Sequence, residues 1–278
     1  MFQLILYTFV VNALQQIMLK FLYIISILLV IFNSISFLYE PSEIYKILGH
    51  MLFMPITGLV YGFLRDWQFG KIDQRIFLVC LIGCIGDGII FFVLNEKGEF
   101  LQLVSAFFVH FIFINIFRNE GAYVFNIAKI NILKVLVPAL IVFFFFGFVL
   151  LPVLPNVLYF MVIFYAIEVA ILVVIGYFRP VSENEYWLVA VGVTLLLLKD
   201  ILYSYFFFVF KSNQHLLYIP FYIFNALAYF LIIYGIAINQ NTNREVQEKI
   251  SIKLILNIIH SLFKKKIKSN IFDSIFLK

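Results

Sequence analysis

Charged side chains are scarce in this sequence. Only 13% of its 278 residues are Asp, Glu, Lys or Arg, whereas a soluble domain carries about 25%. The apolar share is 64%, and the mean hydropathy is +1.05. In water, so many apolar side chains would form an exposed patch over most of the surface. The composition therefore excludes an ordinary soluble domain and predicts an integral membrane protein.

Cysteine is also rare. The two cysteines, Cys80 and Cys84, are too few for a disulfide framework or a zinc site. Their four-residue spacing places them on one helix face, where small apolar packing residues are expected. The HExxH, GxSxG and glycine-rich phosphate-binding motifs are missing from the sequence. Any chemistry must therefore come from isolated polar residues within apolar segments.

Long apolar runs dominate the chain instead. A membrane-spanning helix needs about 20 mostly apolar residues, and turn formers or charges separate the runs. Continuous runs of this length favour helices over barrel strands, which would alternate with a period of two. The sequence thus predicts an all-α membrane protein, a polytopic bundle of about eight transmembrane helices over residues 21–39, 44–63, 74–94, 100–118, 131–150, 156–177, 186–206 and 216–237.

Two flanking segments differ from this domain, which covers residues 21–240. Residues 1–20 are apolar but are interrupted by Asn12, Gln15 and Gln16. They fit either an interfacial helix or an extension upstream of a start at Met18.

The tail, residues 241–278, mixes apolar residues at a four-residue spacing with lysines, among them Lys264, Lys265, Lys266 and Lys268. This pattern predicts a basic amphipathic helix on the anionic inner leaflet of the membrane. A nucleic-acid partner is not predicted, because a basic flank beside a membrane domain is explained by the lipid surface.

The short loops predict an orientation, because Lys and Arg are enriched on the cytoplasmic side. If the first span leaves the cytoplasm near Lys20, the inner loops hold Arg65, Lys71, Arg75, Arg118, Lys129, Lys134 and Arg179. The outer loops and helix ends then hold only Lys46, Lys97 and Lys211. We therefore expect a multi-pass protein of the cell membrane with both termini in the cytoplasm.

Polar residues within the spans are the candidate site. An ionisable side chain at mid-membrane costs about 2.5–3.5 kcal/mol and seldom faces lipid. At a rise of 1.5 Å per residue, four polar residues of the spans lie roughly 9–14 Å below the outer boundary of the membrane, and His110 lies slightly deeper. We therefore expect a shared pocket in the outer half of the bundle, formed by His50, Asp87, Asp200 and Asn225.

Two further ionisable residues are not placed in this pocket. Lys199 adjoins Asp200, but consecutive helix residues point about 100° apart, so Lys199 is expected to pair elsewhere or to reach toward the interface. Glu168 has no partner that the sequence identifies.

These residues resemble motifs of the YhhN family of membrane proteins, the lysoplasmalogenase family, over roughly residues 21–237. Residues 82–87 (Ile-Gly-Cys-Ile-Gly-Asp) are similar to its small-residue segment ending in Gly-Asp, and residues 106–110 (Ala-Phe-Phe-Val-His) to its fourth-helix pattern. Tyr186, Trp187, Gly192 and Asp200 resemble its seventh-helix stretch. Each motif is short, and their order along the chain carries the likeness.

The chain departs from the family at several positions. The family's Lys near the start of the second helix is replaced by His50, with Lys46 one turn earlier, and its Ser before the second Asp is Lys199. Asn225 or Tyr229 stands for a Gln of the last helix.

The resemblance implies hydrolysis of the vinyl ether bond of a lysoplasmalogen, a lysophospholipid, to a fatty aldehyde and a glycerophospho-ethanolamine or -choline. Asp87 and Asp200 would be the catalytic pair. His50 or Lys46 would bind the phosphate, and His110 with Asn225 would position water. The implied reaction needs no metal or cofactor.

The chemistry agrees with these residue types. A vinyl ether is cleaved when a carboxylic acid protonates its carbon and water adds to the resulting cation, so one carboxyl group supplies the proton and the other activates water. Two alternatives use the same residues. In one, the pocket binds or transports a lipid without chemistry. In the other, the buried acids only fix helix packing in a structural or partner-binding protein.

Overall fold

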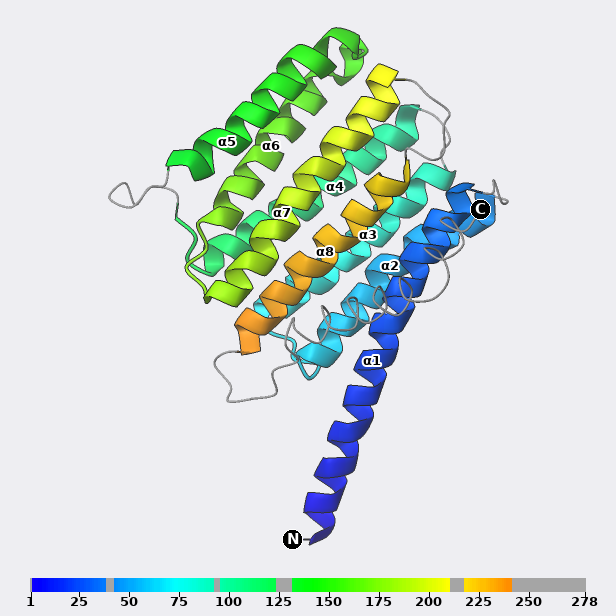
Figure 1. Cartoon of the computed structure of the whole chain (residues 1–278), viewed down its shortest axis with the longest axis vertical. Helices are drawn as coiled ribbons and strands as arrows, with labels where there is room; N and C mark the ends of the chain where they lie inside the picture. The colour runs from blue at the N-terminus through cyan, green and yellow to red at the C-terminus, as the bar shows by residue number, and fades with distance from the viewer. Residues whose placement is uncertain (1, 39–42, 93–95, 124–131, 211–217, 242–278) are drawn as a thin grey trace, which may run out of the picture. The chain divides into compact units, whose positions relative to one another are not determined.

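The computed structural model describes residues 2–38, 43–92, 96–123, 132–210 and 218–241, and all regular structure within them is helical (Figure 1). Residues 1–240 form one compact unit. Residues 242–278, which include nearly all of the predicted amphipathic tail, lie outside the described part of the chain.

Eight α-helices occur in the described ranges, with short π- and 3-10 helical segments beside three of them. Most of their ends lie within three residues of the predicted ends. The elements are α1 (Phe2–Leu38), α2 (Glu43–Leu64), α3 (Lys71–Phe92), α4 (Glu96–Asn119), α5 (Ile132–Phe144), η2 (Phe145–Leu150), η3 (Leu151–Val153), η4 (Asn156–Leu158), α6 (Tyr159–Tyr177), α7 (Glu183–Ser204), η5 (Tyr205–Phe210) and α8 (Tyr218–Asn241).

The first helix differs most from its predicted span. It runs without a break from Phe2 to Leu38, so residues 2–20 and the predicted first span belong to one helix of 37 residues. At 1.5 Å per residue it is about 55 Å long, and its N-terminal end extends past the other helices (Figure 1).

Within the described ranges, six helices are long and apolar enough to cross a membrane. They include α1, α4, α6 and α8, together with α5 and α7 when their adjoining π-helical segments are counted. The described apolar stretch of α2 is shorter, Met51–Leu64, and α3 carries four charged residues. The coarse prediction of an all-helical, multi-pass membrane protein is confirmed.

Small residues allow the helices of the bundle to approach closely. A Cβ atom at Gly86 of α3 would collide with the Ser105 side chain of α4, and one at Gly83 would meet Met54 of α2. At Gly192 of α7 it would lie 3.1 Å from the Ala228 carbonyl oxygen of α8. These approaches bring α3 against α2 and α4, and α7 against α8.

The end of the bundle with the predicted inner loops is held by buried ion pairs. Arg179 Nε donates to Glu120 Oε2 at 2.7 Å, and Asn239 Nδ2 donates to Glu120 Oε1 at 2.7 Å. Nearer the start of the chain, Arg65 Nε donates to Asp73 Oδ1 at 2.9 Å. The predicted inner loops after α2 and α6 therefore fold back onto helix ends instead of extending from the bundle.

Candidate functional site

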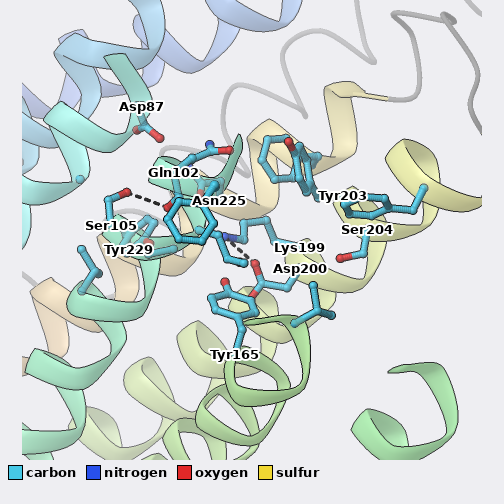
Figure 2. Close-up of a pocket in the computed structure, with 18 of the residues that line it drawn as sticks. Asp87, Gln102, Ser105, Tyr165, Lys199, Asp200, Tyr203, Ser204, Asn225 and Tyr229 are labelled. Atoms are coloured by element: carbon cyan, nitrogen blue, oxygen red, sulfur yellow. Dashed lines mark hydrogen bonds and ion pairs between the residues drawn. The ribbon is translucent and has the colours of Figure 1, made fainter. Parts of the chain in front are cut away.

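A pocket of about 1030 Å³, counting the open space at its mouth, lies among α3, α4, α6, α7 and α8. Most of its lining comes from the C-terminal parts of α3 and α7 and the N-terminal parts of α4, α6 and α8, whereas Arg65 and Arg179 follow the C-terminal ends of α2 and α6. Its polar lining consists of Asp87, Gln102, Ser105, Tyr165, Lys199, Asp200, Tyr203, Ser204, Asn225 and Tyr229 (Figure 2).

Four of the predicted site residues meet in this pocket. Asp87 comes from α3, Asp200 from α7, and both Asn225 and Tyr229 from α8. The similar depths inferred from helix lengths therefore correspond to one shared cavity. Lys46 and His50 lie on α2, but their side chains fall outside the described residues, so their predicted role in phosphate binding stays a prediction.

Lys199 is placed differently from the prediction. Its Nζ lies 2.7 Å from Asp200 Oδ1, and both side chains are more than nine-tenths buried. The prediction that Lys199 pairs elsewhere was wrong, because the four methylenes of the lysine side chain let the ammonium bend back to a neighbour whose Cβ points another way. The second carboxylate of the pocket is thus part of an ion pair.

The two carboxylates face the pocket from opposite sides (Figure 2). Among the described interactions, Asp200 contacts Lys199 rather than Asp87. Lys199 and Tyr229 line the same pocket as the two acids (Figure 2). The arrangement is therefore an acid and an ion pair across a cavity, not two carboxyl groups that share a proton.

His110 lies behind the pocket lining. Its side chain is fully buried on α4, and its ring packs against Tyr165 of α6 with 5.4 Å between the ring centroids. His110 Nδ1 lies 3.9 Å from Oε2 of Glu168, which is therefore the partner that the sequence did not identify. Tyr165 itself lines the pocket, and its hydroxyl is turned toward Asp200 (Figure 2).

The rest of the lining is apolar and includes two π-helical segments. Phe146 belongs to η2 and Phe208 to η5, and these segments contact each other at the C-terminal ends of α5 and α7. Phe100, at the start of α4, is 41% exposed. Such a cavity, with polar groups on the inside and aromatic side chains toward its edge, suits an amphipathic ligand.

Sequence reasoning missed several polar groups of the lining. Gln102 and Ser105 lie one turn apart near the start of α4, where the Ser105 hydroxyl donates to the Gln102 carbonyl oxygen at 2.8 Å. Tyr165 lies three residues before Glu168 and so shares its helix face. That spacing was the one signal available for Tyr165, because Tyr occurs 16 times in the chain.

These features define a class: a helical, multi-pass membrane protein with an acidic pocket inside the bundle. No protein-family model matches the chain, and neither a curated protein nor a solved structure shows significant similarity to it. The resemblance to the YhhN family therefore stays a prediction.

Proposed function

We propose that this protein is a membrane-embedded hydrolase of ether-linked lysolipids, similar in activity to the lysoplasmalogenases. The observation that carries the proposal is the meeting of Asp87 and Asp200, from distant parts of the chain, in one pocket with Asn225 and Tyr229. Ionisable groups inside a membrane are costly and usually functional. A pocket with two carboxyl groups and an apolar wall fits an acid-catalysed reaction on a lipid chain.

The geometry favours different roles for the two acids. Asp200 is held by Lys199, whereas Asp87 forms no ion pair among the described contacts. We assign proton donation to Asp87. Its proton goes to the double-bond carbon that is not bonded to oxygen, and the carbon bonded to oxygen becomes an oxocarbenium ion. Water then adds to the cationic carbon, and Asp200 takes the proton that this water loses. The resulting hemiacetal breaks its carbon–oxygen bond to give an aldehyde and a free glycerol hydroxyl.

The lining residues would position the substrate for this chemistry. Phe146 and Phe208 would contact the alkenyl chain, and Asn225 would hydrogen-bond the glycerol backbone. Lys199 fixes the Asp200 carboxylate at the place where water must lose its proton. Preorganised groups of this kind accelerate a reaction because they need not reorganise as charge develops.

The membrane arrangement is part of the proposal. We infer eight spans, with α2 and α3 crossing the membrane alongside the six longer apolar helices, and a location in the cell membrane. Because basic residues gather at the opposite end of the bundle, we infer that both termini are in the cytoplasm. The pocket then lies in the outer half of the membrane, and the lysine-rich tail faces the anionic inner leaflet.

Incubating the purified protein with lysoplasmenyl-ethanolamine and measuring fatty aldehyde tests the function. Asp87→Asn and Asp200→Asn should each lower turnover by about 10²-fold or more, while Glu183→Gln on the exposed start of α7 should leave it unchanged. A lysolipid with a saturated alkyl ether should bind without cleavage. Aldehyde formation equal to wild type in the Asp87→Asn variant would rule out the assigned mechanism.

One observation favours a second candidate function. The Lys199–Asp200 ion pair neutralises one of the two acids, as a pocket that binds lipid without chemistry would allow. Binding of both ether lysolipids with no aldehyde from either would support this lipid-binding or transporting protein.

A further inference from the structure

A second polar cluster lies one helical turn deeper in the bundle than the pocket. It contains His110 of α4 and Glu168 of α6, whose side chains are 0% and 7% exposed. All four polar atoms of these two side chains are buried without a hydrogen-bond partner in the described part of the chain, as is Oδ2 of Asp200. Five such atoms in one region are unusual, because buried polar groups nearly always have a partner.

The cluster is connected to the pocket through Tyr165. The Tyr165 ring packs on His110, and its hydroxyl faces Asp200. Glu168 lies three residues after Tyr165 on α6, so its side chain shares a helix face with the residue whose hydroxyl is turned toward Asp200 (Figure 2). Three helices, α4, α6 and α7, thus contribute buried polar atoms that lack hydrogen-bond partners among the described residues.

The 3.9 Å between His110 Nδ1 and Glu168 Oε2 is too long for a direct hydrogen bond. Buried water molecules typically make about three hydrogen bonds to polar groups that otherwise lack partners. A histidine and a carboxylate beside a second carboxylate offer both donors and acceptors for such water. A metal ligand set is a poorer match, because no three His, Cys, Asp or Glu side chains in the described part of the chain are arranged so that they could hold a metal ion.

We propose that His110 and Glu168, with Oδ2 of Asp200, form an internal water site that feeds the pocket. Water held there satisfies the unpartnered atoms and lies next to the carboxylate that activates water in the proposed reaction. This second role rests on the proposed function. When a water molecule adds to the oxocarbenium carbon, its O–H bond breaks, its proton passes to Asp200, and water from the site replaces it. His110 and Glu168 are positioning residues, since they act through Asp200.

Infrared difference spectroscopy of the purified protein in lipid nanodiscs tests the water site without turnover. The wild-type minus Glu168→Leu spectrum should show an O–H stretching band that shifts when the sample is hydrated with ¹⁸O-labelled water. Glu168→Gln keeps hydrogen-bonding capacity and should retain the band. Thr57→Val, which removes a buried hydroxyl bonded to the Phe53 carbonyl oxygen outside this region, should give no ¹⁸O-sensitive difference.

The outcomes separate the two proposals. A folded Glu168→Leu variant that binds the alkyl ether lysolipid and shows no ¹⁸O-sensitive difference from wild type overturns the water site. An inactive wild type with the band present overturns the hydrolase proposal and leaves the water site in place. In an active protein, Glu168→Leu should lower kcat by about 10²-fold with KM within about twofold. Unchanged kcat after loss of the band overturns the supply of water to the pocket.

Discussion

The ammonium of Lys199 lies 2.7 Å from the carboxylate of Asp200, although the two residues are consecutive on α7. Both side chains are more than nine-tenths buried, so each charge depends on the other. Breaking a buried ion pair from one side leaves an uncompensated charge, which costs about 3–5 kcal/mol.

Lys199→Met should therefore destabilise the protein by about 3 kcal/mol. The double variant Lys199→Met/Asp200→Asn should recover at least about half of this loss, because it removes both charges. Thermal unfolding in detergent measures the difference. Additive losses in the double variant would mean that the two residues are energetically independent.

Gly86→Ala should also be destabilising, by about 1–3 kcal/mol, because the added methyl group would overlap the Ser105 side chain. Gly147 is the matched control: a Cβ there meets nothing within 4 Å, and Gly147→Ala should be neutral or slightly stabilising. Ser105→Gly in the Gly86→Ala background should restore stability. Equal unfolding temperatures for the two alanine variants would contradict close packing of α3 on α4.

Glu120, after the end of α4, is hydrogen-bonded to Arg179 after α6 and to Asn239 near the end of α8. Glu120→Ala should cost about 3–5 kcal/mol, because it leaves the fully buried Arg179 guanidinium without its carboxylate. Glu183→Ala, on the exposed first turn of α7, should change stability by less than about 0.5 kcal/mol. Unfolding in denaturant gives the free energy of unfolding of both variants, and these two values are compared. A Glu120→Ala variant as stable as its control would show that Arg179 finds another partner.

The proposed orientation predicts which loops reach the cell exterior. In a background with both native cysteines replaced by alanine, a cysteine at the exposed position Asn156, before α6, should react with a membrane-impermeant maleimide in intact cells. A cysteine at the exposed position Asn184, in the first turn of α7, should react only after permeabilisation. The reverse pattern would place both termini outside.

The helices and the common layer of Asp87, Asp200 and Asn225 could be predicted from the sequence. Charges and turn formers end each apolar run, and the fixed rise of a helix converts residue counts into depth. The contact between His110 and Glu168 could not be predicted in this way, because depth does not show which faces of α4 and α6 meet. The bend of the Lys199 side chain was missed for a related reason: helix geometry fixes the direction of Cβ but not of a long, flexible side chain.

The π-helical segments make the shape of the pocket sensitive to chain length. A π-helical hydrogen bond encloses one more residue than an α-helical one, so the residues beyond it are rotated by about 100° relative to an uninterrupted α-helix. Phe208 reaches the pocket from within such a segment. Losing a single codon from this region would redirect the aromatic wall while leaving Asp87, Lys199 and Asp200, which precede it in the chain, in place. Related proteins could therefore acquire a different range of ligands through a one-residue deletion instead of substitution.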